Sequence, residues 1–394
     1  MSQGRAQQAV TSIESLGTPL AFKVRTAGLP AGRDEARNIR IRSEVRALEG
    51  MQKEALVYDA SSKTVWRMVS DEGPYLEGTD LAPFPLGFYT AGVVFSYMTE
   101  ILRHAATLGV EVASLDLTSD HYYTMQGSAL RGDMIGGAMP IEVTVGLQTD
   151  AEEPKELRIL EMAQASSPAE AYMRDSLRNT FSLVANGRDL ELDDLPELTA
   201  GDRASRPDFD GVEPLAGECA DDIISKLAAA EVVHGVVGGA GSSLQAVQKR
   251  ILHVRGEAKL ISDTLKEIEV HLLQPIGSSF RFQGEDGGRQ RAPSAPAYLS
   301  AGIGFCFMTQ LGRYAHITKR SLTSYEIVQE NVFHYGSTDA TGVGQATAEP
   351  VDTRVFLALD ETDEVARKMV SMGERTCFLH AALRGSHPTR VRRT

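Results

Sequence analysis

The chain has 394 residues, which is long enough for two or three domains. Hydrophobic residues make up 42% of it and charged residues 24%, the proportions of an ordinary globular protein. The formal net charge of −13 argues against nucleic acid or anionic lipid as a partner, because both are bound through basic patches.

The sequence shows no sign of secretion or membrane insertion. Residues 1–8 contain no basic segment followed by an apolar run, so no secretory signal is predicted. The most apolar stretch, residues 298–311, is shorter than the roughly 20 residues that cross a bilayer. We therefore expect a cytoplasmic protein that does not bind membranes.

The first half predicts two strands, a buried helix, two more strands, a second helix and a last short strand. The strands and the first helix are expected at residues 38–46, 54–58, 88–108, 110–117 and 141–147, with the second helix starting after Asp150 as its N-cap. The first helix is apolar over most of its first three turns. We expect such a helix to run through the middle of a domain.

The middle of the chain has a different composition. Residues 189–210 are acidic and contain two prolines, and residues 221–233 have the spacing of a short amphipathic helix. Residues 235–243 are rich in glycine but lack the lysine of a phosphate-binding loop. We interpret residues 189–245 as a flexible linker that contains one short helix.

The second half predicts the same order of elements. A strand begins near residues 255–257, an apolar helix covers residues 298–318, and strands follow at residues 324–328 and 351–359. The last helix is expected after Asp360 and ends near Arg375.

The two halves are copies of one pattern at a constant spacing. Residues 91–99 read AGVVFSYMT and residues 301–309 read AGIGFCFMT, which is an offset of 210 residues. The same offset aligns Ser96 with Cys306 and Ser167 with Cys377. A repeat of this length predicts two tandem domains, at residues 1–188 and 246–394, rather than a solenoid.

Only the second copy has cysteines at the two aligned positions. A single cysteine on an apolar helix is more often a small core residue, so Cys306 alone predicts little. Two cysteines that replace two serines of the other copy indicate a functional pair. Cys219, in the linker, has no counterpart and is interpreted as an inert thiol. Ser96 and Ser167 indicate that the first copy is a structural partner.

This pattern resembles the OsmC/Ohr family of thiol peroxidases. The resemblance rests on a small-residue apolar helix with Cys306, a strand pair, and a helix that ends at Cys377. It implies an α+β fold in which curved antiparallel sheets surround central long helices. The family normally forms an intertwined homodimer. In this chain the two OsmC-like copies would form an intramolecular pseudo-dimer, and the chain could still oligomerise further.

The resemblance also implies a chemistry. Cys306 would attack a small apolar organic hydroperoxide, and Cys377 would resolve the resulting sulfenic acid as a disulfide that a dithiol reductant then reduces. The family's arginine corresponds best to Arg255 or Arg42. Its glutamate would fall at Pro296, so the acid is absent. No cofactor and no metal are implied.

Two other functions remain open. On the same scaffold, Cys306 could be the nucleophile of a hydrolase or lyase, or an acid/base pair with His380. Alternatively, the protein could bind a small ligand without turning it over. Cys377 and His380 form a CxxH motif, but without a second spaced pair this motif does not predict a metal site.

Overall fold

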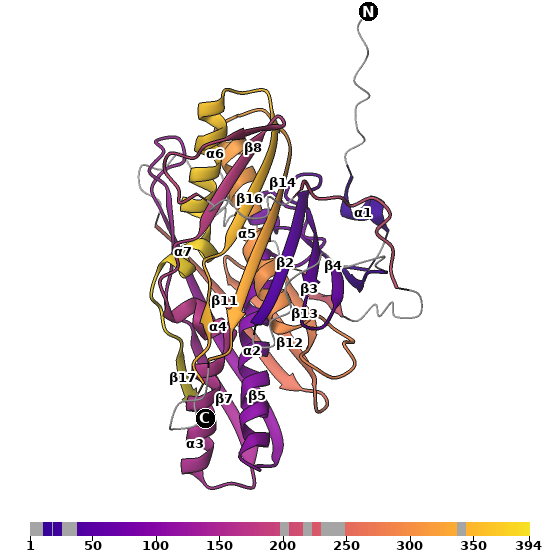
Figure 1. Cartoon of the computed structure of the whole chain (residues 1–394), viewed down its shortest axis with the longest axis vertical. Coiled ribbons are helices and arrows are strands. Elements are labelled where there is room, and N and C mark those ends of the chain that lie inside the picture. Colours follow the sequence, from indigo (N-terminus) through magenta and orange to yellow (C-terminus); the bar gives the residue numbers. More distant parts are fainter. Residues whose placement is uncertain are drawn as a thin grey trace, which may run out of the picture.

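The fold was analysed in a computed structural model of the chain (Figure 1). The structure describes residues 11–17, 19–25, 38–197, 205–215, 223–229, 249–336 and 344–394. Cys219 and the glycine-rich residues 235–243 lie outside these ranges.

The first sheet combines strands from both halves of the chain. Its order is β1 (Ala21–Lys23), β4 (Thr64–Ser70), β3 (Lys53–Asp59), β2 (Asn38–Ala47), β14 (Leu322–His334), β16 (Asp352–Leu359), β8 (Thr180–Ala185) and β9 (Arg188–Leu190), with β15 (Thr347–Ala348) beside β14. The two halves join at the antiparallel pair β2–β14, where Arg42 lies opposite Glu330.

The second sheet is built in the same way. Its order is β10 (Ile224–Ala228), β13 (Ser279–Glu285), β12 (Leu265–Gln274), β11 (Lys249–Leu260), β5 (Val112–Gln126), β7 (Glu142–Thr149) and β17 (Arg390–Arg393), with β6 (Ile135–Ala138) beside β5. The halves join at β11–β5, where Arg255 lies opposite Asp120. Asp120 and Glu330 are 210 residues apart, so both junctions have the same register.

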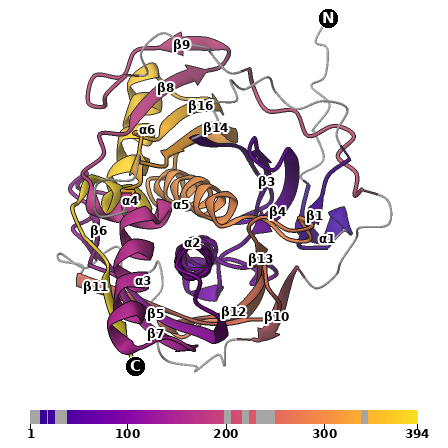
Figure 2. The same cartoon turned by 60° about the horizontal axis from the view of Figure 1, so that its bottom comes forward.

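Two long helices lie between the sheets, α2 (Pro85–Thr107) and α5 (Ala295–Ile317) (Figure 2). They begin a few residues earlier than the predicted helices and are buried along most of their length, as their composition predicts. They cross where Gly92 and Gly302 let the two backbones approach closely. Apolar side chains from both halves form one large core around this crossing, so the halves do not bury separate cores.

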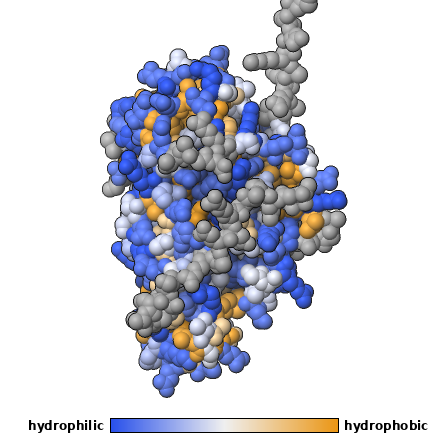
Figure 3. Space-filling view, in the orientation of Figure 1, coloured by the Kyte–Doolittle hydropathy of each residue, from blue (hydrophilic) through white to orange (hydrophobic). Residues whose placement is uncertain are grey.

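Shorter helices complete the fold. They are α1 (Ile13–Leu16), the 3-10 helix η1 (Pro74–Leu76), α3 (Glu153–Ser166), α4 (Pro168–Arg174), α6 (Asp363–Thr376) and α7 (Phe378–Arg384). Figure 1 shows α6 and α7 stacked end to end in yellow at the side of the first sheet. Hydrophilic residues cover most of the face drawn in Figure 3, with small separate hydrophobic areas.

Three local predictions were wrong. The segment predicted as a linker helix contains the strand β10, because the edge of β13 offers backbone hydrogen-bond partners that a short isolated helix lacks. Thr362, not Asp360, caps α6, through a bond from the backbone N–H of Val365. Asp150 does not cap α3 either; its carboxylate accepts the N–H of Glu111 at 3.0 Å.

Within the described residues, no helix is both long and apolar enough to cross a membrane.

Candidate active site

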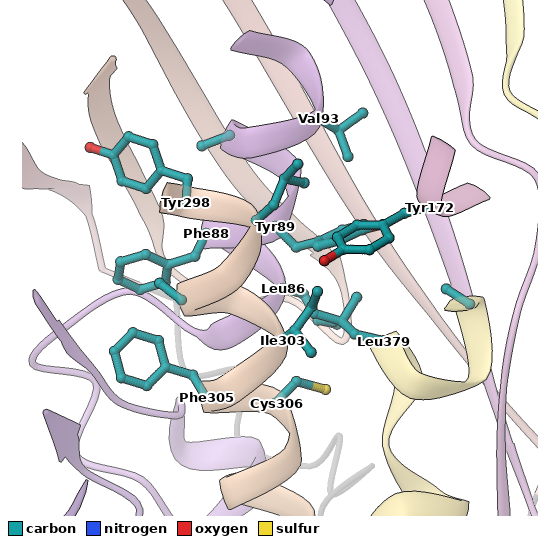
Figure 4. Close-up of a cluster of buried hydrophobic side chains, with 14 of the residues drawn as sticks. Leu86, Phe88, Tyr89, Val93, Tyr172, Tyr298, Ile303, Phe305, Cys306 and Leu379 are labelled. Carbon is teal, nitrogen blue, oxygen red and sulfur yellow. The ribbon is translucent and has the colours of Figure 1, made fainter. Parts of the chain in front are cut away.

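The candidate site is formed by Cys306 on α5 and Cys377 between α6 and α7. Cys306 is 2% exposed and Cys377 is fully buried, and both are free thiols. Figure 4 shows the Cys306 sulfur pointing toward α7, among the apolar side chains of Leu86, Ile303 and Leu379. The site is therefore buried in an apolar environment.

Cys306 and Cys377 are near each other in the fold, although they lie 71 positions apart in the sequence. Cys306 lies close enough to Cys377 to raise the pKa of the Cys377 thiol. The same geometry occurs in the first half, where the hydroxyls of Ser96 and Ser167 are 2.9 Å apart. Since both pairs bridge a long central helix and the start of a short helix, the fold brings these two positions together in each half.

Cys377 occupies a junction that the sequence did not predict. It ends α6 and is also the N-cap of α7, with its sulfur 3.5 Å from the backbone nitrogen of His380. Burial raises the pKa of the Cys377 thiol well above its usual range, and Cys306 raises it further. The backbone N–H groups of Leu379 and His380 lower it, but burial dominates. Cys377 is therefore protonated at neutral pH.

His380 lies directly beside Cys377. Its Nδ1 is 3.2 Å from the Cys377 sulfur, and its Nε2 has no hydrogen-bond partner among the described residues. The ring packs between Phe181 and Phe307, with centroids 5.4 Å away on both sides. Burial, and then the charge of Arg384, lower the pKa of His380 to about 3. The neutral ring can accept the Cys377 proton at Nδ1 when its own proton is on Nε2.

The two arginines proposed as activators do not lie beside the thiols. Arg255 forms a two-bond ion pair with Asp120, at 2.9 and 3.1 Å. Arg42 pairs with Glu44 at 2.7 Å and approaches Glu330 at 3.7 Å.

Strand alternation explains this placement. The neighbours of the arginines in sequence face the central helices: Ser43 bonds to Ser300 on α5, and Gly256 faces Thr90 on α2. The arginine side chains therefore point to the outer faces of the sheets, and the ion pairs described above join them to carboxylates rather than to Cys306.

The cation whose charge reaches Cys306 is Lys53, which the sequence analysis missed. Lys53 begins β3, is fully buried, and donates a hydrogen bond to the carbonyl of Met51. Burial lowers the pKa of Lys53, whereas the charges of Glu72, Asp71 and a Cys306 thiolate raise it. The repeat held a signal for this residue: an offset of 213 residues aligns Arg42 with Arg255 and also Lys53 with the buried Lys266.

A buried carboxylate completes the polar side of the site. Glu72 accepts a hydrogen bond from the Tyr75 hydroxyl at 2.6 Å. Burial raises the pKa of Glu72, while the charge of Lys53 and the hydrogen bond from Tyr75 lower it. Lys53 and Glu72 come from the first half of the chain and the thiols from the second, so both halves contribute to the site.

The serine pair lacks a base. His104 Nε2 is 2.8 Å from the Ser166 hydroxyl, and Ser166 in turn donates to Glu100 at 2.6 Å. Among the described residues, Ser96 bonds only to the Ser167 hydroxyl and the backbone N–H of Ala169. Without a base in hydrogen-bond reach, Ser96 is not an activated nucleophile.

Residues 286–392 match the protein-family model described as OsmC-like protein. Over these residues the chain is similar to the OsmC-like family. No curated protein matches the chain. Among solved structures, it is similar to an OsmC-like hydroperoxide resistance protein from Jannaschia sp. CCS1, at 20% identity and a TM-score of 0.21, over 32% of this chain and 81% of that one.

Both thiols and His380 lie inside the OsmC-like segment, whereas Lys53, Arg42 and Arg255 precede it. Within the described residues, no group of three or more His, Cys, Asp or Glu side chains is arranged to hold a metal ion.

Proposed function

We propose that this protein is a thiol-dependent peroxidase that reduces organic hydroperoxides through Cys306 and Cys377. The observation that carries the proposal is the proximity of the two thiols, seen in the effect of Cys306 on the pKa of Cys377, within the segment that matches the OsmC-like family model. We also propose that the halves are duplicated OsmC-like domains, 1–188 and 246–394, paired as an intramolecular pseudo-dimer. The equivalent junctions β2–β14 and β11–β5 support this pairing.

In the first step, the Cys306 thiolate attacks the terminal oxygen of the hydroperoxide. The S–O bond forms, the O–O bond breaks, and the departing alkoxide takes a proton to leave as an alcohol. Cys306 is then a sulfenic acid. Lys53 is the buried cation that stabilises the negative sulfur before attack.

In the second step, Cys377 attacks the sulfenic sulfur, and its thiol proton goes to the departing hydroxyl, which leaves as water. The neutral His380, with Nδ1 3.2 Å from the Cys377 sulfur, orients the thiol. The product is a Cys306–Cys377 disulfide, and a dithiol reductant returns both thiols. The apolar surroundings of Cys306 favour a hydroperoxide with an apolar organic group.

The test is a titration with cumene hydroperoxide. One equivalent is expected to consume two thiols, and mass spectrometry should find a peptide that joins Cys306 to Cys377. The Cys306→Ser variant should lose no thiols, and Cys377→Ser should accumulate a sulfenic acid that dimedone traps. Cys219→Ser is the matched control and should behave as the unmodified protein.

If both thiols remain free after excess hydroperoxide, the peroxidase proposal is wrong. A hydrolase or lyase that uses Cys306 as a nucleophile would give this result, because its reaction requires no disulfide.

A further inference from the structure

A cavity of about 410 Å³ lies at the serine pair of the first half, at the position that corresponds to the thiol site. Its size is within the range of small-molecule binding sites. Residues from both halves line it, including Ser96, Glu100, Trp66, Asp286, Ser294 and Tyr335. The proposed peroxidase reaction uses none of them.

Comparison of the two halves shows why the cavity is open here. At the 210-residue offset, Ser294 corresponds to Phe84, Pro296 to Leu86, and Pro168 to Phe378. Ser294, Pro296 and Pro168 line the cavity, although the first two come from the second half of the chain, and their larger apolar counterparts are buried. The site around Ser96 thus has smaller side chains at the positions that larger apolar side chains occupy at the equivalent site around Cys306.

The cavity has an acidic lining. Four carboxylates line it, those of Asp59, Glu100, Glu285 and Asp286, and no lysine or arginine does so within the described residues. Three of the carboxylates form ion pairs with basic side chains that do not line the cavity. These pairs are Glu100 with Arg103, Glu285 with Arg291, and Asp286 with Lys266 at 2.9 Å. Asp59 is instead bonded to serine hydroxyls. One negative charge is left in excess, so the cavity disfavours an anion.

Glu100 offers the best anchor for a ligand. Its side chain is 1% exposed, and its Oε2 is occupied by Arg103 and Ser166. Its Oε1 accepts only one bond of 3.5 Å, from the Tyr335 hydroxyl, among the described residues. Oε1 therefore retains acceptor capacity at the cavity wall. Trp66 adds an aromatic wall on which a ring with polar substituents can pack.

We propose that the serine half binds a small hydroxylated molecule, neutral or carrying one amine, in this cavity. Binding is non-covalent, since Ser96 has no base. The proposal does not depend on the peroxidase reaction.

Three pyranoses of the same shape test it: glucosamine, glucose and glucuronate, which differ in charge. Titration calorimetry with the full-length protein is expected to give the tightest binding for glucosamine, weaker binding for glucose and the weakest for glucuronate. Glu100→Gln introduces the residue found at the corresponding position 310, and it should weaken glucosamine binding by about tenfold or more, because a charge-assisted bond is lost.

Pro168→Phe introduces the counterpart Phe378 and should abolish binding of all three sugars by filling the cavity. Circular dichroism checks that both variants fold. Cys306→Ser is the control and should bind as the unmodified protein does. The proposal is overturned if none of the sugars binds saturably, if glucuronate binds as tightly as glucosamine, or if folded Pro168→Phe still binds.

Discussion

The crossing of the two central helices offers the sharpest structural prediction. A methyl group on Gly302 would lie 2.7 Å from the backbone nitrogen of Tyr89, and one on Gly92 would lie 2.7 Å from the backbone nitrogen of Leu299. Both obstacles are backbone atoms, so a rotamer change cannot relieve the clash and the helices must separate. Tyr89 and Leu299 are 210 residues apart, so the two contacts are equivalent.

The expected change in the free energy of unfolding is the difference between two opposing contributions. Overpacking of a core costs about 1–3 kcal/mol, and a clash with backbone is at the upper end of this range. Replacing a helical glycine by alanine stabilises the helix by about 1 kcal/mol, because alanine has the higher helix propensity. We therefore expect Gly302→Ala and Gly92→Ala each to lower the free energy of unfolding by about 2 kcal/mol. The double variant should lose less than the sum, because one separation of the helices relieves both clashes.

Urea unfolding, followed by the fluorescence of the single tryptophan and by circular dichroism, measures these changes. Gly87→Ala is the matched control on α2, because its methyl group would meet only side-chain atoms at 3.6 Å. Its stability should be unchanged or raised by up to about 1 kcal/mol. If Gly302→Ala unfolds at the same urea concentration as Gly87→Ala, the inferred close approach of the helices is incorrect.

Three further predictions concern the sites. Lys53→Gln should slow thiol consumption by cumene hydroperoxide at pH 7 by about tenfold or more, because about 1.4 kcal/mol of charge stabilisation is lost. An unchanged rate in stopped-flow measurements would exclude Lys53 as the activating cation. The neutral form of His380, with a folded pKa of about 3, adds stability that is present above pH ~6.5 and is lost as the pH falls toward 3. His380→Phe should therefore lose stability less steeply over that interval in thermal melts, and an identical acid profile would contradict this assignment. Combined Ser96→Cys and Ser167→Cys should form a second disulfide with diamide, since the present hydroxyls are 2.9 Å apart; mass spectrometry detects the bridge, and its absence would show that the two pairs are not geometrically equivalent.

The proposals describe two halves with different properties. The site in the second half has two buried thiols among apolar side chains, whereas the site at Ser96 has an acidic cavity. The difference arises from few positions, among them Pro168 and Ser294. One scaffold can thus hold a reaction site and a binding site without a change in its backbone arrangement.

The sequence predicted the long helices and several of the strands, because their periodicity is local. The two apolar helices, the strand pairs beside them and the paired positions of Cys306 and Cys377 all follow from spacing alone. The short helix α7 was missed, since one extended residue, Cys377, interrupts an otherwise helical run. The strand β10 was missed because its hydrogen-bond partners lie on β13, more than 50 residues away.

The sequence by itself determined the repeat and the identity of the two thiol positions, since both are properties of spacing along the chain. Only the tertiary structure decided which charges face the sulfur. Strand alternation turns Arg42 and Arg255 outward into ion pairs, while Lys53 reaches the site from the other half across the shared core. Electrostatic and packing interactions depend on distance in space, and here residues from opposite halves provide them.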